Sequence, residues 1–150
     1  MRSTLIFTAT YNEADNISAL MADIWSHSSD SDILVVDDNS PDGTGAILDD
    51  IQKRSDGKLQ VIHRPRKLGL GSAHKLAMKY AVENGYDYLI TMDADFSHNP
   101  KYIPTIIGLL DSNDFVIGSR YVEGGRCDYG QARLLLSKTA NFLTKKLLKI

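Results

Sequence analysis

Two aspartates, Asp93 and Asp95, stand on either side of Ala94 and directly follow the mostly apolar residues 89–92. Residues two apart in an extended segment point to the same side, so both carboxylates would face one point. Like charges this close are unfavourable without a cation. Mg²⁺ or Mn²⁺, bound by one or two carboxylates together with water and substrate phosphates, would remove the repulsion. The alternative is a solvated loop with acidic caps, and the position of the pair after a strand favours the metal.

A second acidic pair, Asp37 and Asp38, follows another apolar run. A carboxylate at a strand end can accept hydrogen bonds from ribose hydroxyls or a base N–H, as acidic residues do in dinucleotide-binding folds. An aspartate here can equally form a turn ahead of Pro41, Asp42 and Gly43. The residues alone leave both interpretations open.

Four basic residues surround the segment Gly69-Leu70-Gly71-Ser72, namely Arg64, Arg66, Lys67 and Lys75. Glycines let backbone approach a ligand closely, and the start of a helix favours an anion. The segment is not a Rossmann fingerprint, because a third glycine is missing and the segment follows the third strand rather than the first. A phosphate-binding P-loop is also absent from the sequence. A tight turn with close helix packing is the alternative.

Arg120, followed by Tyr121, could hold a diphosphate through its forked guanidinium, or form a surface salt bridge. His98 lies near the acidic pair, where a role in the loop is favoured over metal ligation. The four histidines lack the spacing of zinc ligands. Ser137 and Cys127 have no recognisable base nearby in the sequence, so nucleophilic catalysis is not indicated.

The elements that would position these residues alternate between strands and helices. Strands are predicted over residues 4–9, 33–36, 59–63, 88–92 and 115–118. Helices are predicted over residues 14–25, 45–54, 72–84 and 101–110, and from about Arg133 to the end. Nearly continuous apolar strands separated by helices predict an α/β fold with a Rossmann-like, open, mostly parallel sheet flanked by helices.

Ligands of such sheets bind beyond the carboxyl ends of the strands. Polar residues follow all five predicted strands: Thr10-Tyr11-Asn12-Glu13, Asp37-Asp38-Asn39-Ser40, Arg64-Pro65-Arg66-Lys67, Asp93-Ala94-Asp95 and Ser119-Arg120-Tyr121. We therefore expect five strand ends to share one polar rim.

The composition of the chain is that of an ordinary globular protein, with 150 residues, 43% hydrophobic and 24% charged. This length fits one domain. A net charge of −2 does not indicate a chain-wide basic surface for nucleic acid. A single cysteine and no long apolar segment predict a cytoplasmic protein.

The last segment, from about Tyr129 onward, has lysines and leucines but no acidic residue. It predicts either a basic amphipathic helix at a membrane surface or a helix packed on the sheet with lysines reaching out to water. The chain ends at Ile150 inside this pattern, without a capping glycine, which predicts a truncated chain.

Taken together, these segments resemble family 2 glycosyltransferases of the GT-A fold, and in particular dolichol- or polyprenol-phosphate mannosyltransferases. The matching segments are residues 10–16, 35–44, 64–73, 92–101 and 118–121, with a last, weaker match over residues 137–143. The most specific runs within them are Ser40-Pro41-Asp42-Gly43-Thr44, Lys67-Leu68-Gly69-Leu70-Gly71 and Asp93-Ala94-Asp95-Phe96-Ser97-His98-Asn99-Pro100. They stand in the family's order and cover nearly the whole chain.

The resemblance implies a role for each matching residue. Ala9, Tyr11, Glu13, Val36 and Asp38 would line the nucleoside site, Asp93 and Asp95 would bind the metal, Ala94 would touch the nucleotide sugar, and Arg120 would meet the diphosphate or the acceptor phosphate. Asp95 and Arg120 would be the catalytic residues. The family usually has proline where Ala9 stands, and some relatives have glutamine, a further metal ligand, where Ser97 stands.

The resemblance implies transfer of mannose from GDP-mannose to a dolichyl or polyprenyl phosphate, with inversion and with Mg²⁺ or Mn²⁺. Residues 1–150 would form the nucleotide-sugar-binding part of a catalytic domain whose C-terminal part is missing. The acceptor would place the protein at the cytosolic face of a membrane, and no nucleic acid is expected. The alternatives are a UDP-sugar donor, a catalytically incomplete nucleotide-sugar-binding module and a generic NAD-binding domain.

Overall fold

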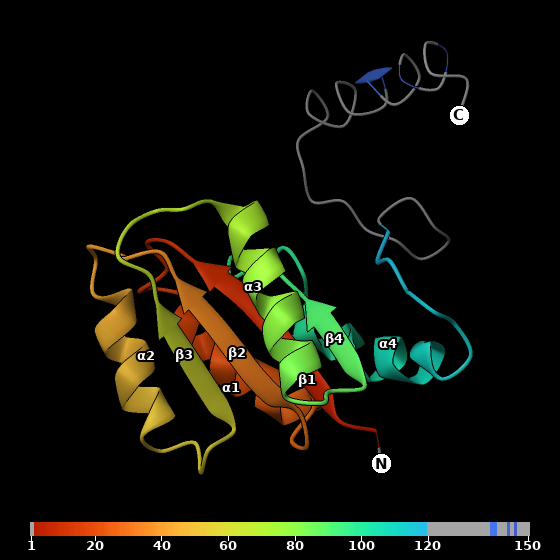
Figure 1. Cartoon of the computed structure of the whole chain (residues 1–150), viewed down its shortest axis with the longest axis horizontal. Helices are drawn as coiled ribbons and strands as arrows, with labels where there is room; N and C mark the ends of the chain where they lie inside the picture. The colour runs from red at the N-terminus through yellow and green to blue at the C-terminus, as the bar shows by residue number, and fades with distance from the viewer. Residues whose placement is uncertain (1, 120–138, 141–143, 145, 147–150) are drawn as a thin grey trace. The chain divides into compact units, whose positions relative to one another are not determined.

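The computed structural model describes residues 2–119, 139, 140, 144 and 146 of the chain (Figure 1). The chain divides into two compact units, Met1–Asp114 and Phe115–Ile150. The first unit contains all the strands and the complete helices described below.

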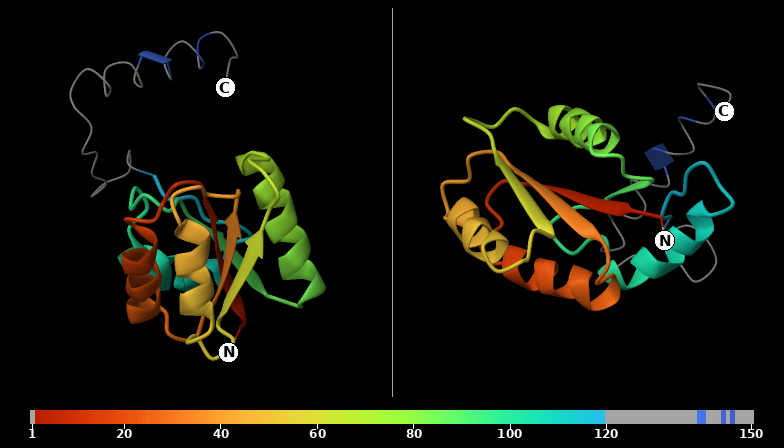
Figure 2. Two further views of the ribbon diagram at one scale, coloured as in Figure 1. Left: turned by 90° about the vertical axis from the view of Figure 1, so that its left-hand side faces the viewer. Right: turned by 60° about the horizontal axis from the view of Figure 1, so that its bottom comes forward.

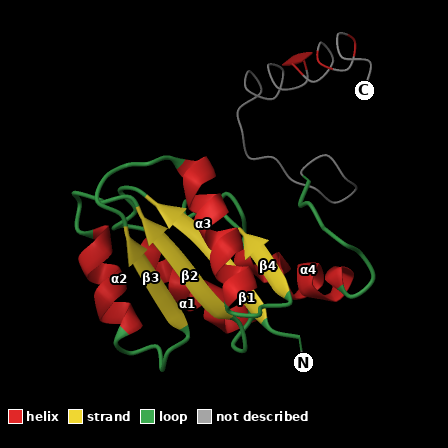
Figure 3. Cartoon of the chain, viewed as in Figure 1, coloured by secondary structure: helices red, strands yellow, loops and turns green. Residues whose placement is uncertain are grey.

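The first unit is built on a four-stranded sheet with the order β3-β2-β1-β4 (Figure 3). Its strands are β1 (Thr4–Thr10), β2 (Asp32–Asp37), β3 (Leu59–His63) and β4 (Tyr88–Thr91). All three pairings are parallel, with Leu5 opposite both Asp32 and Leu89, and Ile33 opposite Leu59. The predicted parallel sheet is therefore confirmed for these four strands.

Helices cover both faces of this sheet. One face carries α1 (Ile17–His27), α2 (Thr44–Gln52) and α4 (Ile103–Leu110), and the other carries α3 (Leu70–Glu83) (Figure 2). Alternate residues of the central strands enter two separate cores, as the period of a strand requires. Ile6 and Val35 pack with α1 and α2, whereas Phe7 and Leu34 pack against Ala73, Ala77 and Ala81 of α3.

Several element ends follow the predicted local chemistry. Asn99 caps the short 3₁₀ helix η1 (Pro100–Tyr102), since its side-chain oxygen accepts a hydrogen bond from the N–H of Lys101 at 3.0 Å. Gly85, with φ of 71°, follows the end of α3, where a left-handed residue stops a helix. In contrast, α1 begins at Ile17 rather than at residue 14, because the amides of residues 12–14 bond to another loop.

The prediction of a fifth strand over residues 115–118 is wrong. These residues belong to the second unit and form no strand. A strand is stable only with a neighbour to take its backbone hydrogen bonds, and none of the described strands pairs with this segment. The predicted C-terminal helix lies largely outside the described residues. The four residues of it that are described, Thr139, Ala140, Thr144 and Lys146, are helical. No helix within the described part of the chain is long and apolar enough to cross a bilayer.

Candidate functional site

The carboxyl ends of the four strands lie at one end of the first unit, the upper end in Figure 1. The loops that follow them, residues 11–16, 38–43, 64–69 and 92–99, form a shared rim. Four of the five predicted strand ends are therefore brought together, and the fifth is not part of this sheet. The crevice beyond these ends is where parallel sheets bind ligands.

The acidic pair after β4 faces away from the core. Ala94 is buried, with 4% of its surface exposed, whereas Asp95 is exposed and about half of the Asp93 side chain is in contact with solvent. This alternation places both carboxylates on the solvent side, as the spacing predicts. Hydrogen bonds from Ser97, first from its hydroxyl and then from its N–H at 2.9 Å, lower the pKa of Asp95. Asp95 therefore stays ionised at neutral pH, which is the form that binds a cation.

His98 shapes the loop that carries this pair. The N–H of Asp93 donates a hydrogen bond to Nδ1 of His98 at 3.1 Å, and Nε2 of the same ring lies 3.9 Å from a carboxylate oxygen of Asp93. An Nδ1 atom that accepts a hydrogen bond carries no proton, so the neutral ring is protonated at Nε2. His98 thus bonds within the loop, as the sequence favoured.

The acidic pair fits a hard divalent ion, part of whose coordination shell would come from oxygen atoms of the substrate. Asp95 uses one oxygen for the Ser97 amide, and the exposed carboxylate of Asp93 has only the distant His98 contact among the interactions described. Within the part of the chain that the structure describes, no cluster of three or more His, Cys, Asp or Glu residues could hold a metal. Mg²⁺ and Mn²⁺ need no such cluster, because one or two carboxylates with water and phosphate oxygens suffice.

Asp37, the first member of the second acidic pair, is a turn-forming residue. It is 2% exposed and accepts hydrogen bonds from the hydroxyl of Thr10 at 2.9 Å and from the N–H of Ser40 at 3.1 Å. The Ser40 hydroxyl also donates to it, at 2.5 Å. The turn interpretation therefore holds for Asp37.

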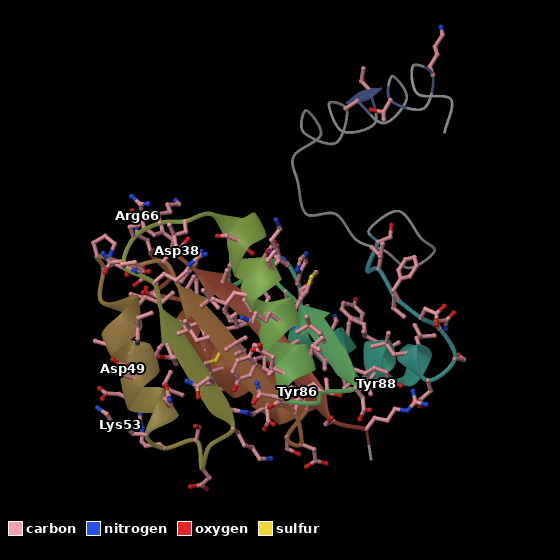
Figure 4. The ribbon with its side chains drawn as sticks, in the orientation of Figure 1. Asp38, Asp49, Lys53, Arg66, Tyr86 and Tyr88 are labelled. Carbon is pink, nitrogen blue, oxygen red and sulfur yellow. The ribbon has the colours of Figure 1, made fainter. Side chains whose placement is uncertain are left out.

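Asp38 faces inward and binds the loop that follows β3. Its carboxylate forms an ion pair with Arg64 and accepts hydrogen bonds from the N–H groups of Leu68 at 3.3 Å and Gly69 at 3.2 Å. Asp38 and Arg64 are only 6% and 7% exposed. Asp38 lies at the rim end of the sheet, near the outward-pointing Arg66 (Figure 4). Its expected contact with a nucleoside stays a prediction.

Arg64 is part of the scaffold, which the sequence did not reveal. Its guanidinium donates to the hydroxyl of Ser72 at 2.5 Å and to the carbonyl of Gly69 at 3.2 Å, besides its pair with Asp38. The only signal in the sequence was that Asp38 and Arg64 each directly follow a strand. Pairing of β2 with β3 brings these two strand ends together.

The loop after β1 is fastened to the run Ser40-Pro41-Asp42-Gly43-Thr44. The N–H of Asn12 donates to the Ser40 hydroxyl at 3.0 Å, and the N–H of Glu13 donates to the Thr44 hydroxyl at 2.9 Å. A third bond joins the N–H of Ala14 to the Asp42 carboxylate at 3.0 Å. This motif therefore fixes the backbone beside Tyr11 and Glu13.

Tyr11 also meets the loop after β3. The ammonium nitrogen of Lys67 lies 3.8 Å from the centre of the Tyr11 ring, which is the geometry of a cation–π contact. Tyr11 is 38% exposed, so its ring is available at the rim between the two loops.

The remaining predicted site residues divide into two groups. Val36 is fully buried, Ala94 is nearly so and Ala9 is partly buried, and all three side chains pack in the cores. Arg120 lies outside the described residues. The structure thus gathers Tyr11, Glu13, Asp38, Asp93 and Asp95 at one rim.

Comparison with known proteins identifies a family and two curated relatives. The model of "Glycosyl transferase family 2" matches residues 5–149. A polyprenol monophosphomannose synthase of Mycolicibacterium smegmatis is 40% identical over 149 residues, which are 98% of this chain and 56% of the relative. An undecaprenyl-phosphate mannosyltransferase of Micrococcus luteus is 41% identical over 122 residues, which are 81% of this chain and 50% of the relative. The chain thus spans about half the length of the curated relatives it matches.

Solved structures share the fold at lower identity. A mannosyltransferase of Pyrobaculum calidifontis, solved with GDP-Man and Mn²⁺, matches with a TM-score of 0.56 and 24% identity, over 63% of this chain and 28% of that one. S. aureus TarS with UDP-GlcNAc matches with a TM-score of 0.60 and 20% identity, over 75% and 32%. These likenesses confirm the predicted GT-A kind of α/β fold.

Proposed function

Since this chain belongs to glycosyl transferase family 2, we propose that it transfers mannose from GDP-mannose to a polyprenyl phosphate. Two relatives at 40% and 41% identity, named as a polyprenol monophosphomannose synthase and an undecaprenyl-phosphate mannosyltransferase, support this activity. The acceptor lipid would bring the protein to the cytosolic face of a membrane.

The observation that carries the proposal is the pair Asp93 and Asp95, exposed at the carboxyl end of β4 on either side of buried Ala94. We propose that these carboxylates hold Mg²⁺ or Mn²⁺. When bound, the ion would offset the negative charge that develops on the leaving diphosphate. The Ser97 hydrogen bonds orient the Asp95 carboxylate, and the bond from the Asp93 N–H to His98 fixes the backbone of the loop that carries the pair before the donor arrives.

In the proposed reaction, a phosphate oxygen of the acceptor attacks the anomeric carbon of mannose on the face opposite the diphosphate. A new C–O bond forms while the bond to GDP breaks, and its electron pair leaves on the GDP phosphate, so the configuration inverts. The acceptor phosphate is already anionic, so the chain needs no strong general base. Asp95, and Arg120 beside a phosphate, would be the residues that contact the reacting groups.

The nucleoside would lie along the loops after β1 and β2. The bonds from the N–H groups of Asn12 and Glu13 to Ser40 and Thr44 fix the loop of Tyr11 and Glu13 there, and the N–H of Asp38 bonds to the carbonyl of Thr10 at the end of β1. Ala9, Val36 and Ala94 complete the proposed contacts, and since their side chains pack in the cores, the backbone would supply their contact.

The donor is tested by a thermal-shift series of GDP-mannose, UDP-glucose and NAD, each with and without Mn²⁺. A ligand that binds only the folded chain raises its melting temperature. We expect GDP-mannose with Mn²⁺ to give the largest shift. A larger shift with UDP-glucose would make UDP-glucose the donor in place of GDP-mannose. The absence of a shift with any nucleotide sugar would refute the proposal.

A second candidate follows from the chain's length, since it spans 56% and 50% of its two relatives. A module that binds the donor without completing transfer is consistent with that coverage. Incubation with GDP-mannose, Mn²⁺ and a polyprenyl phosphate distinguishes the two functions. Mannosyl lipid as product supports the enzyme, whereas binding without product supports the module.

A further inference from the structure

We propose that the loop between β3 and α3, together with the first residue of α3, is a membrane-contacting element, with Leu68 and Leu70 inserted among the lipid headgroups and Arg66 paired with anionic lipid. This inference deepens the proposed function and rests on it, because it assigns the surface by which the donor site would meet a bilayer that holds a polyprenyl phosphate.

Two large apolar side chains are exposed at this rim. Leu68 and Leu70 are 44% and 54% exposed, and every residue from 65 to 72 is exposed. Both leucines belong to the first unit, and neither packs in one of the two hydrophobic cores. Two exposed leucines so close in sequence, one in the loop and one at the start of α3, indicate a binding surface rather than only a connection between two elements.

The backbone between the leucines is already satisfied by the protein. Asp38 accepts the N–H groups of Leu68 and Gly69, and the single hydrogen of the Ser72 hydroxyl has both of their carbonyl oxygens within bonding distance, at 2.9 and 2.8 Å. Arg64 and the N–H of Ala73 also donate to the Gly69 carbonyl, at 3.2 and 3.3 Å, which leaves the Ser72 hydrogen for the Leu68 carbonyl. Unsatisfied backbone groups are costly in an apolar environment, where water does not replace the missing bonds. This loop can enter a headgroup region without exposing any such group at Leu68 or Gly69.

The charge beside the leucines favours a lipid surface over a neutral apolar partner. Arg66 and Lys67 directly precede Leu68, both are exposed, and the stick view shows Arg66 pointing outward from the rim (Figure 4). Lys67 lies over Tyr11 and so faces the donor site. Basic side chains next to apolar ones are the combination that binds anionic membranes.

The position of the loop suits an acceptor that is drawn from a bilayer. It follows β3, whereas Asp93 and Asp95 follow β4, at the opposite edge of the same sheet. Three strand spacings of about 4.8 Å separate the two loops by roughly 14 Å along the rim. A membrane that touches Leu68 and Leu70 therefore lies within reach of the acidic pair, with the donor loops between them.

The test is co-sedimentation of the chain with two kinds of vesicle, phosphatidylcholine alone and phosphatidylcholine with one third phosphatidylglycerol. We compare the chain with the double variant Leu68→Gln/Leu70→Gln. The matched control is Met78→Gln/Val82→Gln, which changes two residues of α3 that are 53% and 80% exposed. We expect the loop variant to partition roughly tenfold more weakly on both vesicles and the control to behave as the unchanged chain.

Arg66→Gln tests the charge separately. It should weaken binding to the anionic vesicles by roughly fivefold and leave binding to neutral vesicles unchanged. Equal binding of the loop variant and the unchanged chain, equal losses in the loop and control variants, or no binding at all would overturn the inference. Leucine-dependent self-association without lipid would overturn it too, in favour of a surface between two copies.

The same samples distinguish failure of this inference from failure of the proposed function. Leu68 bonds to Asp38 and Ser72 only through its backbone, and the printed bond of Leu70 joins its carbonyl to the His74 ring, so the loop variant should keep its thermal shift with GDP-mannose and Mn²⁺. A retained shift with unchanged vesicle binding refutes the membrane contact alone. Leucine-dependent vesicle binding without a shift refutes the proposed donor alone.

Discussion

Arginine is a residue type that suggests phosphate binding, yet the Arg64 guanidinium forms its hydrogen bonds and its ion pair inside the protein. It pairs with Asp38 and donates to Ser72 and Gly69, and it is 7% exposed. A buried charge is tolerated only when it is paired and hydrogen-bonded. Arg64 therefore supports the rim loops rather than a ligand directly.

The variant Arg64→Met should lower the free energy of unfolding by about 3–5 kcal/mol, because it leaves the Asp38 carboxylate buried and uncompensated. Adding Asp38→Asn should restore part of the loss, since it removes that charge. Urea unfolding measures both. Lys53→Met is the control, because Lys53 lies on the outside of the molecule at the end of α2 (Figure 4) and its exposed pair with Asp50 should contribute no measurable stability. Equal losses at Arg64 and Lys53 would contradict the structural role of the buried pair.

Asp42 gives the fold a pH dependence at the residue scale. Hydrogen bonds from the Thr44 hydroxyl, and then from the N–H of Ala14, hold the pKa of Asp42 below its ordinary value of 3.8. Because the folded pKa is lowered, the stabilisation is complete above the ordinary value and is lost as pH falls from that value through the lowered one. Asp42→Asn should therefore make the unfolding free energy fall less steeply below about pH 4. An unchanged slope in acid unfolding curves would show that Asp42 contributes nothing.

At the scale of elements, the loops depend on one another rather than on their own sequences. The helix predicted to begin at residue 14 begins at Ile17, because the amides of Asn12, Glu13 and Ala14 bond to the loop after β2. Local propensity predicted the helix, but contacts between residues 28 to 31 positions apart set its start. The same long-range contacts explain why the Asp38–Arg64 pair was not visible in the sequence.

Two glycines at the start of α3 should respond in opposite ways to alanine. Gly69 has φ of 88°, where a side chain is strained, so Gly69→Ala should lower the unfolding free energy by about 1–3 kcal/mol. Gly71 is helical, and an added Cβ would meet nothing within 4 Å, so Gly71→Ala should raise it by about 0.5–1 kcal/mol. Thermal unfolding of both variants measures these changes. A lower unfolding free energy for Gly71→Ala would mean that the added methyl group meets a neighbour, against the open space that surrounds Gly71 in the structure.

At the scale of the whole molecule, the sequence predicted the framework well and its edges less well. Four strands, their parallel pairing and the helices between them are confirmed, because apolar runs and turn residues such as Gly85 and Asn99 report local structure directly. Residues 115–118 failed as a strand because an apolar run does not specify its neighbour. The exposed positions of Asp93 and Asp95 followed from their spacing alone, whereas the burial of Val36 and Arg64 depended on tertiary packing.

The division of the chain after Asp114 predicts that the first unit folds independently. Residues 1–114 contain both cores and Trp25, the only tryptophan in the chain, which packs against the larger core. Urea should unfold this fragment in one cooperative transition, with a slope of about 1–3 kcal/mol per molar urea, followed by Trp25 fluorescence. Gradual, non-cooperative loss of the signal would mean that the remaining residues complete the core.

Asp93 and Asp95 are the residues that we propose hold the metal that binds the donor diphosphate. Calorimetric titration with GDP-mannose, with and without Mn²⁺, tests it on the unchanged chain, on Asp95→Asn and on Asp30→Asn. Asp30 is an exposed aspartate between α1 and β2, at the other end of the sheet, and serves as the matched charge control. Mn²⁺ should strengthen donor binding by about tenfold or more in the unchanged chain and in Asp30→Asn. Loss of a residue that only supports a metal ligand already weakens metal binding by about that factor. Asp95→Asn should lose this dependence on Mn²⁺, and an Asp95→Asn chain that responds to Mn²⁺ like the unchanged one would contradict the account.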